Sequence, residues 1–97
     1  MTFSFTQDVP IDAEFYQRIR DGLGDEIAPG LILHVATERP EGGLRYLDVW
    51  ETKEDFERFV DERLHTVVHD LLREIFGDDL PPEPELVPVS TIHVWHP

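Results

Sequence analysis

Apolar residues recur with two different periods along this chain, and the period separates predicted strands from predicted helices. Apolar and polar residues alternate over residues 3–7, which is typical of a short β-strand. After Asp12, a residue suited to cap a helix, apolar residues recur at helical spacing as far as Leu23, and Gly22 and Gly24 are expected to end the helix. Residues 31–37 and 44–50 are rich in aliphatic side chains and flank a glycine-containing turn, so we expect a β-hairpin.

A second helical pattern occupies the next part of the chain, from Thr52, which is expected to cap the helix, to Phe76. Neither glycine nor proline interrupts it, so we expect either one long helix or two helices that bend near residues 63–65. Residues 78–85 contain three prolines and four acidic residues, which predicts an exposed connection. Residues 86–95 are expected to form the last strand.

The order of these elements predicts one domain over residues 1–97 with the succession β-α-β-β-α-β. This succession defines the ferredoxin-like arrangement. The predicted fold class is therefore α+β, with a four-stranded antiparallel sheet and both helical segments on one face.

The last three strands of this predicted sheet carry apolar residues on both faces. In the second strand Leu31, Leu33 and Val35 share one parity, whereas Ile32 and Ala36 share the other. An antiparallel sheet covered on one face only is expected to alternate apolar with polar residues. No sequence remains to cover the second face, so we expect a homodimer in which two sheets pack against each other.

The composition excludes several function classes. The 97 residues include 8 Lys and Arg against 21 Asp and Glu, for a formal net charge of −13. Nucleic acids and anionic membranes carry the same sign, so we expect neither as a partner. The absence of cysteine excludes disulfides, thiolate nucleophiles and iron–sulfur clusters. With no signal-peptide pattern at the start and no stretch near the ~18 apolar residues of a membrane span, a cytoplasmic location is expected.

Two histidines on the second predicted helix are candidates for chemistry. His65 and His69 are four residues apart, at the margin of an apolar arc that also holds Leu72 and Phe76. A zinc protease needs glutamate directly after the first histidine, and Thr66 stands there, so that class is excluded. Two interpretations stay open: the histidines line a pocket, or they lie at the core margin and bond to the backbone.

Polar and aromatic side chains within the predicted hairpin form a second group of candidates. Burying His34 or Asp48 without a partner costs on the order of 1–3 kcal/mol, so each belongs to a structural network or to a pocket. Tyr46 and Trp50 either stack on an aromatic ligand or pack in a core or interface. Arg45 is expected to form an ion pair with one of the many acids rather than to anchor an anionic substrate.

The residues around the end of the hairpin resemble a known family. Residues 48–51 (DVWE), residues 52–59 (TKEDFERF) and the downstream His65 and His69 are similar to the antibiotic biosynthesis monooxygenase-like family of dimeric α/β barrels. The resemblance covers nearly the whole chain. It implies two ferredoxin-like subunits joined through their sheets, each with a pocket between helices and sheet. Members include cofactor-independent monooxygenases that act on aromatic polyketides, haem-degrading monooxygenases, and proteins with no known activity.

The haem-degrading branch of that family places a histidine, an asparagine and a tryptophan beside the haem. By resemblance, His69 falls at the position of the iron ligand and Gln7 near the asparagine, while Phe59 replaces the tryptophan. The chain thus keeps one of these three residues. A haem-binding protein with His69 as axial ligand is one alternative function, and a non-catalytic small-ligand-binding module is another.

The leading expectation is a cofactor-independent monooxygenase that oxidises an aromatic or polyketide-like molecule with O2. His69, with His65 in reserve, would remove a phenol or enol proton as general base, and Gln7 would donate a hydrogen bond to the resulting oxyanion. No metal is expected. The expected substrate-binding residues are Phe59, Trp50, Tyr46, His34, Leu72 and Phe76.

Overall fold

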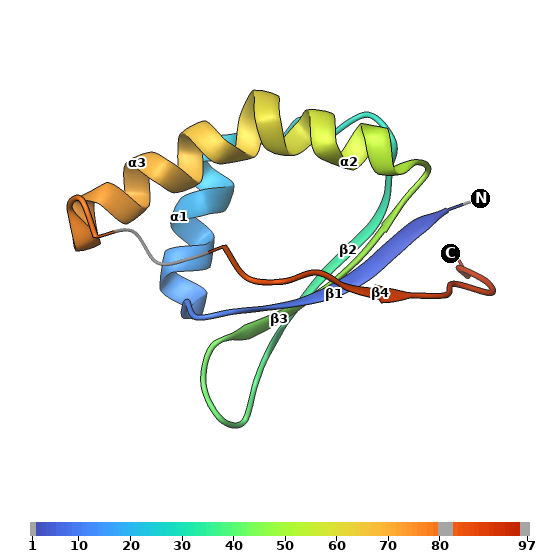
Figure 1. Ribbon diagram of the computed structural model, residues 1–97, viewed down its shortest axis with the longest axis horizontal. Coiled ribbons are helices and arrows are strands. Elements are labelled where there is room, and N and C mark those ends of the chain that lie inside the picture. Colours follow the sequence, from blue (N-terminus) through green and yellow to red (C-terminus); the bar gives the residue numbers. More distant parts are fainter. Residues whose placement is uncertain (1, 80–82, 96–97) are drawn as a thin grey trace.

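Four strands form one antiparallel sheet, and the helices lie over one of its faces (Figure 1). The computed structural model describes residues 2–79 and 83–95. The strands occur in the order β2-β3-β1-β4 across the sheet, which is compatible with the predicted ferredoxin-like fold. Along the chain the elements are β1 (Phe3–Val9), α1 (Ala13–Leu23), β2 (Leu31–Glu38), β3 (Leu44–Trp50), α2 (Lys53–Phe59), the π-helical turn η1 (Val60–Leu64), α3 (His65–Phe76) and β4 (Val87–Val89).

Both predicted helix caps are present. The Asp12 carboxylate accepts a hydrogen bond from the backbone N–H of Phe15 at 2.8 Å, and the Thr52 hydroxyl accepts one from Asp55 at 3.1 Å. Each cap satisfies an N–H group that has no partner inside its helix. The helices therefore begin where the sequence indicates.

Gly22 lies inside α1, where the sequence suggested that it helps to end the helix. A Cβ atom on Gly22 would lie 2.7 Å from a methyl carbon of Val67, so this glycine allows α1 and α3 to approach each other closely. An ion pair between Arg18 and Glu74 joins the same two helices. The chain leaves α1 at Gly24, whose φ of 80° suits glycine.

The second helical pattern is one continuous path with a π-helical turn in its middle. Residues 60–64 form this turn, and the helical path is unbroken from residue 53 to residue 76, which corresponds to the expected single long helix rather than to two helices that bend. A π turn contains one residue more than an α turn for the same advance around the axis. The turn directly precedes His65, the first residue of α3.

Two details of the strands differ from the expectation. A bulge between Leu31 and Leu33 places these residues on opposite faces of the sheet, although they have the same parity in the sequence. The predicted last strand over residues 86–95 is reduced to Val87–Val89. Pro88 has no N–H to donate, which confines β4 to the sheet edge.

The fully buried core lies where α2 covers the sheet. Phe5 and Trp50 are the largest fully buried side chains, and Ala28 completes the buried cluster. Aromatic rings of α2 pack on them, with 4.8 Å between the ring centroids of Phe5 and Phe56 and 5.4 Å between those of Trp50 and Phe59. By contrast, α3 has no buried residue, because its apolar side faces open space above the sheet.

Within residues 2–79 and 83–95, no helix combines the length and the apolar character needed to cross a bilayer.

Candidate functional site

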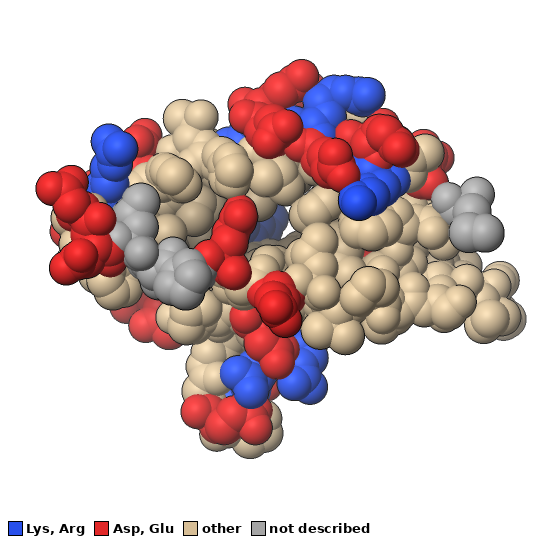
Figure 2. Space-filling model, viewed as in Figure 1, with Lys and Arg blue, Asp and Glu red and all other residues tan. Residues whose placement is uncertain are grey.

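A cavity of about 930 Å³ separates α3 from the sheet. The space-filling view shows it as an opening between the helical layer and the strands (Figure 2). The wall is mostly apolar, and α1 and α3 supply much of it through Phe15, Ile19, Val68, Leu72 and Phe76. The helices thus direct their apolar stripes at the cavity rather than at the sheet.

Every residue that the sequence singled out for a site lines this one cavity. The group includes residues from the first strand, the hairpin and the long helical region, which are far apart in the sequence. All of them line the cavity, whatever each residue does there. The residues are Gln7, His34, Tyr46, Trp50, Phe59, His65, His69, Leu72 and Phe76.

His65 and His69 lie together at the α3 side of the cavity. Their ring centroids are 5.3 Å apart, as expected for positions one helical turn apart. His65 Nε2 is 3.0 Å from a carboxylate oxygen of Glu83, in the segment that leads to β4. Of the two interpretations of these histidines, the pocket lining is the one that the structure shows.

Gln7 contacts the same segment from the opposite side of the cavity. Its amide nitrogen donates a hydrogen bond to the backbone carbonyl of Pro84 at 3.0 Å. The amide has two N–H groups, so this bond leaves a second donor. Together, Gln7 and His65 connect residues 83–84 to the sheet and to α3.

A hydrogen-bonded chain of four side chains crosses the α1 side of the cavity. The Tyr16 hydroxyl is 2.8 Å from His34 Nε2, and His34 Nδ1 is 2.5 Å from Asp48 Oδ1. The second carboxylate oxygen of Asp48 accepts a hydrogen bond from the indole N–H of Trp50 at 3.1 Å. For His34 and Asp48 the structure thus joins the two alternatives, because they form a network that is also part of the pocket wall.

Tyr16, which belongs to these four side chains, and the neighbouring Tyr46 are both held in their neutral form. Burial is the main cause that raises the pKa of Tyr16, and the charge of Asp48 adds to it while Arg20 opposes it. Burial also raises the pKa of Tyr46, with Tyr16 and Asp48 as further causes. The Tyr46 ring centroid lies 5.1 Å from that of His34. At neutral pH Tyr16 is therefore a hydrogen-bond donor.

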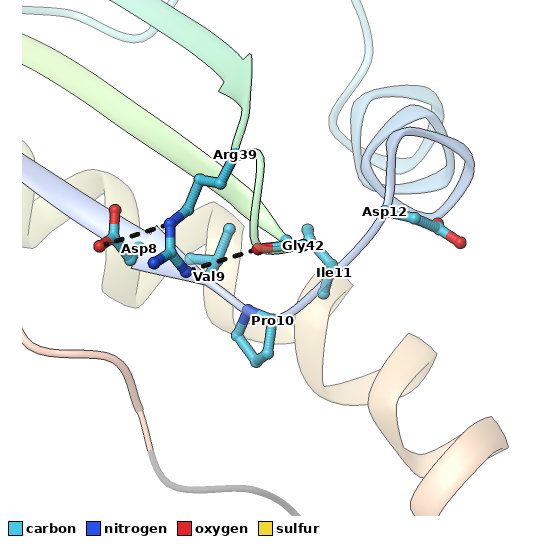
Figure 3. A pocket seen from close by; sticks show the side chains of 8 residues that line it. Asp8, Val9, Pro10, Ile11, Asp12, Arg39 and Gly42 are labelled. Carbon is cyan, nitrogen blue, oxygen red and sulfur yellow. Dashed lines mark hydrogen bonds and ion pairs between the residues drawn. The ribbon is translucent and has the colours of Figure 1, made fainter.

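A second, shallow depression lies outside the cavity, where the turn after β1 meets the hairpin (Figure 3). Arg39 reaches across it between Asp8 and the carbonyl of Gly42, while Asp12 points away from it. Arg45 binds the Asp8 carboxylate through two hydrogen bonds of 2.7 and 3.1 Å, which confirms the predicted ion pair. These bonds are the main cause that lowers the pKa of Asp8. These ion pairs connect the hairpin to the end of β1.

Sequence reasoning missed Tyr16 and Glu83 as parts of the site. Tyr16 belongs to the apolar stripe of α1, and Glu83 is one of many acids in an exposed segment. A signal for the pairing of His34 with Asp48 was present, since each lies seven residues from Glu41, the midpoint of the hairpin turn. Such symmetry places two residues opposite each other in an antiparallel hairpin.

No family model matches the chain, and no curated protein sequence matches it. The fold and the cavity define an α+β protein with a four-stranded antiparallel sheet, compatible with a ferredoxin-like fold, and a cavity between sheet and helices.

Proposed function

We propose that the protein binds a planar aromatic or polyketide-like molecule in this cavity and oxidises it with O2, without a bound cofactor. The observation that carries the proposal is a cavity of about 930 Å³ whose apolar wall contains a few polar, titratable groups. Cavities of roughly 300–1,000 Å³ with this kind of wall are typical of small-molecule sites. Flat aromatic side chains favour a flat aromatic ligand.

The charges on the wall favour a neutral or weakly acidic ligand. Six lining residues carry carboxylates and two carry guanidinium groups: Asp12, Glu26, Asp48, Glu57, Asp61 and Glu83 against Arg20 and Arg63. Both hydrogen bonds of Arg63 Nη2 go to backbone carbonyls, those of Leu23 and Glu26. The two carboxylates of haem would meet this acidic wall, so these residues do not fit haem and we propose none as a resident cofactor.

In the proposed reaction His69 removes an acidic phenol or enol proton, and the free N–H of Gln7 stabilises the oxyanion. The resulting carbanion adds O2 to give a hydroperoxide. Loss of water from the hydroperoxide leaves a carbonyl group, so one oxygen atom enters the product and the other leaves as water. The substrate supplies all the electrons, and no metal is required.

Oxygen uptake with hydroxyanthrone-type compounds tests this proposal. We expect turnover, with one atom from ¹⁸O₂ in the product, and a loss of about 100-fold or more in kcat for His69→Ala. Thr66→Ala is the matched control, because Thr66 is exposed on the same helix and does not line the cavity. Full turnover by His69→Ala would refute the role of His69, and no uptake by the native protein would refute the oxidation.

We also propose that a second copy of the chain covers the other face of the sheet. Val87 and Val89 pair with Thr6 and Ser4, whereas the cavity is lined by the alternate residues of β1. Val87 is 56% exposed and Val89 40% exposed on this outer face. Residues other than Lys, Arg, Asp and Glu make up most of the surface over β4 and the adjoining C-terminal segment (Figure 2). Burying such residues against a second sheet is favourable.

Sedimentation equilibrium at micromolar concentration tests the homodimer. We expect a mass of two chains for the native protein and of one chain for Val89→Glu, because a buried unpaired carboxylate opposes association. Thr37→Glu, on the hairpin edge of the same face, shows whether added charge alone has this effect. A native mass of one chain contradicts the dimer.

A further inference from the structure

We propose that Asp48, His34 and Tyr16 form a proton relay, and that the Tyr16 hydroxyl binds an ionisable hydroxyl or enol oxygen of the substrate. The inference rests on the proposed function and adds a second acid–base group to the same cavity. It rests on the positions of three side chains from α1, β2 and β3. All three line the cavity, on the side formed by α1 rather than by α3.

The geometry assigns the protons in this chain. An ionised carboxylate only accepts hydrogen bonds, so His34 must donate from Nδ1 to Asp48. In the neutral imidazole Nε2 is then an acceptor, and it faces the Tyr16 hydroxyl at 2.8 Å. Tyr16 therefore donates to His34 and keeps its oxygen lone pairs available to a ligand. A histidine oriented by a carboxylate is the usual form of a general base.

Asp48 is placed to pair with the positive charge that the relay creates on His34. Among residues 2–79 and 83–95, His34 is the sole ion-pair partner of Asp48. The Asp48 side chain is only 9% exposed, whereas that of His34 is 29% exposed. Besides the imidazole, the carboxylate has the neutral indole N–H of Trp50. The imidazolium that the relay forms would therefore have a buried counter-ion.

Among the described groups that face His34, Asp48 alone carries a negative charge. From α1 these are Tyr16 and, farther off, Arg20, which carries a permanent positive charge. From β3 they are Asp48 and Tyr46, and burial keeps the Tyr46 phenol neutral by raising its pKa. Asp48 is therefore the one carboxylate that contacts the His34 ring in the described part of the chain.

In the relay, two protons move in one step. The substrate hydroxyl gives its proton to the Tyr16 oxygen while Tyr16 gives its own proton to His34 Nε2. No free tyrosinate forms, which agrees with the effect of burial on Tyr16. The products are a substrate oxyanion, a neutral Tyr16 that donates a hydrogen bond to it, and an imidazolium paired with Asp48. Charge and protons balance without another reactant.

Imidazole ¹⁵N NMR of the free protein tests the first part of the relay without a ligand. We expect His34 to be the Nδ1–H tautomer, and we expect Tyr16→Phe to shift the resonance of Nε2 but not that of Nδ1. An Nε2–H tautomer would overturn the relay, because Tyr16 could not then donate to that nitrogen.

Binding of 2-naphthol, a planar phenol that is largely neutral at neutral pH and whose ionised form has its own absorption band, tests the second part. We expect the native protein to bind it with the ionised fraction raised at neutral pH. Tyr16→Phe keeps the ring and should weaken binding of the ionised form about tenfold, as expected for a hydrogen bond to a charged group. His34→Gln should lower the ionised fraction, and Thr66→Ala should change neither.

The outcomes separate the relay from the proposed function. If the native protein ionises the phenol and only His69→Gln abolishes this, the relay is wrong and the proposed function stands. If Tyr16→Phe and His34→Gln both bind the ionised phenol like the native protein, the relay is wrong as well. If the native protein does not bind the phenol, the cavity does not take this class of ligand, and both proposals fail.

Discussion

Replacement of Trp50 by phenylalanine tests how firmly the relay is anchored in the core. Trp50 is almost completely buried, and its indole N–H donates to the Asp48 carboxylate at 3.1 Å. The substitution removes this donor and leaves space beside Phe56 and Phe59, whose rings pack on the indole. The carboxylate then keeps His34 as its remaining side-chain partner.

We expect Trp50→Phe to lower the free energy of unfolding by about 3 kcal/mol. A hydrogen bond to a charged group contributes about 1.5–3 kcal/mol, and removal of buried ring atoms adds about 1 kcal/mol. Urea unfolding followed by far-UV circular dichroism measures the change, since the variant lacks one of the two tryptophans that fluorescence would report.

Two further variants separate the hydrogen bond from the packing. Tyr46→Phe removes a hydroxyl from the same side of β3, where no described residue bonds it, so it should change stability by less than about 0.5 kcal/mol. In a double-mutant cycle, Trp50→Phe and Asp48→Asn should couple by about 1 kcal/mol or more. Additive effects of these two substitutions would refute the anchoring role of the indole.

Three other predictions follow from the described contacts. A raised pKa means that the folded state resists ionisation of Tyr16 and Tyr46 while the unfolded chain ionises near pH 10, so stability should fall as pH rises above 10. Tyr46→Phe should flatten this fall in pH-dependent thermal melts. Gly22→Ala should destabilise the contact between α1 and α3, and Val67→Ala in the same chain should restore most of the lost melting temperature. Hemin titration should give no sharpened Soret band; a band that disappears in His69→Ala would instead support the haem alternative.

The sequence predicted the elements wherever local chemistry decides them. Asp12 and Thr52 cap helices because their side chains bond N–H groups only three residues away. The hairpin could be predicted in the same way from its turn. The bulge at residues 31–33 and the shortness of β4 could not, because pairing with neighbouring strands determines them.

The sequence predicted most of the polar residues that line the cavity, but not all of the residues that bond to them. Polar residues in apolar strands and paired histidines on a helix marked the cavity wall correctly, since each needs a partner or a solvent-filled space. Tyr16 was missed because its ring belongs to the apolar stripe of α1 while its hydroxyl bonds His34 at the cavity wall. Only the packing of α1 over β2 reveals this second use.

The π-helical turn at residues 60–64 lets the long helical segment contain one residue more than a regular helix would need to join α2 to α3 in the same orientation. An α-helix turns by about 100° per residue, so the extra residue of this turn changes by about 100° the direction in which the side chains of α3 face relative to those of α2. A chain with one residue fewer here would build the same wall with a regular helix. Deletion of a single residue at this point is therefore a change that the architecture can absorb, whereas within α3 it would exchange the residues that face the cavity.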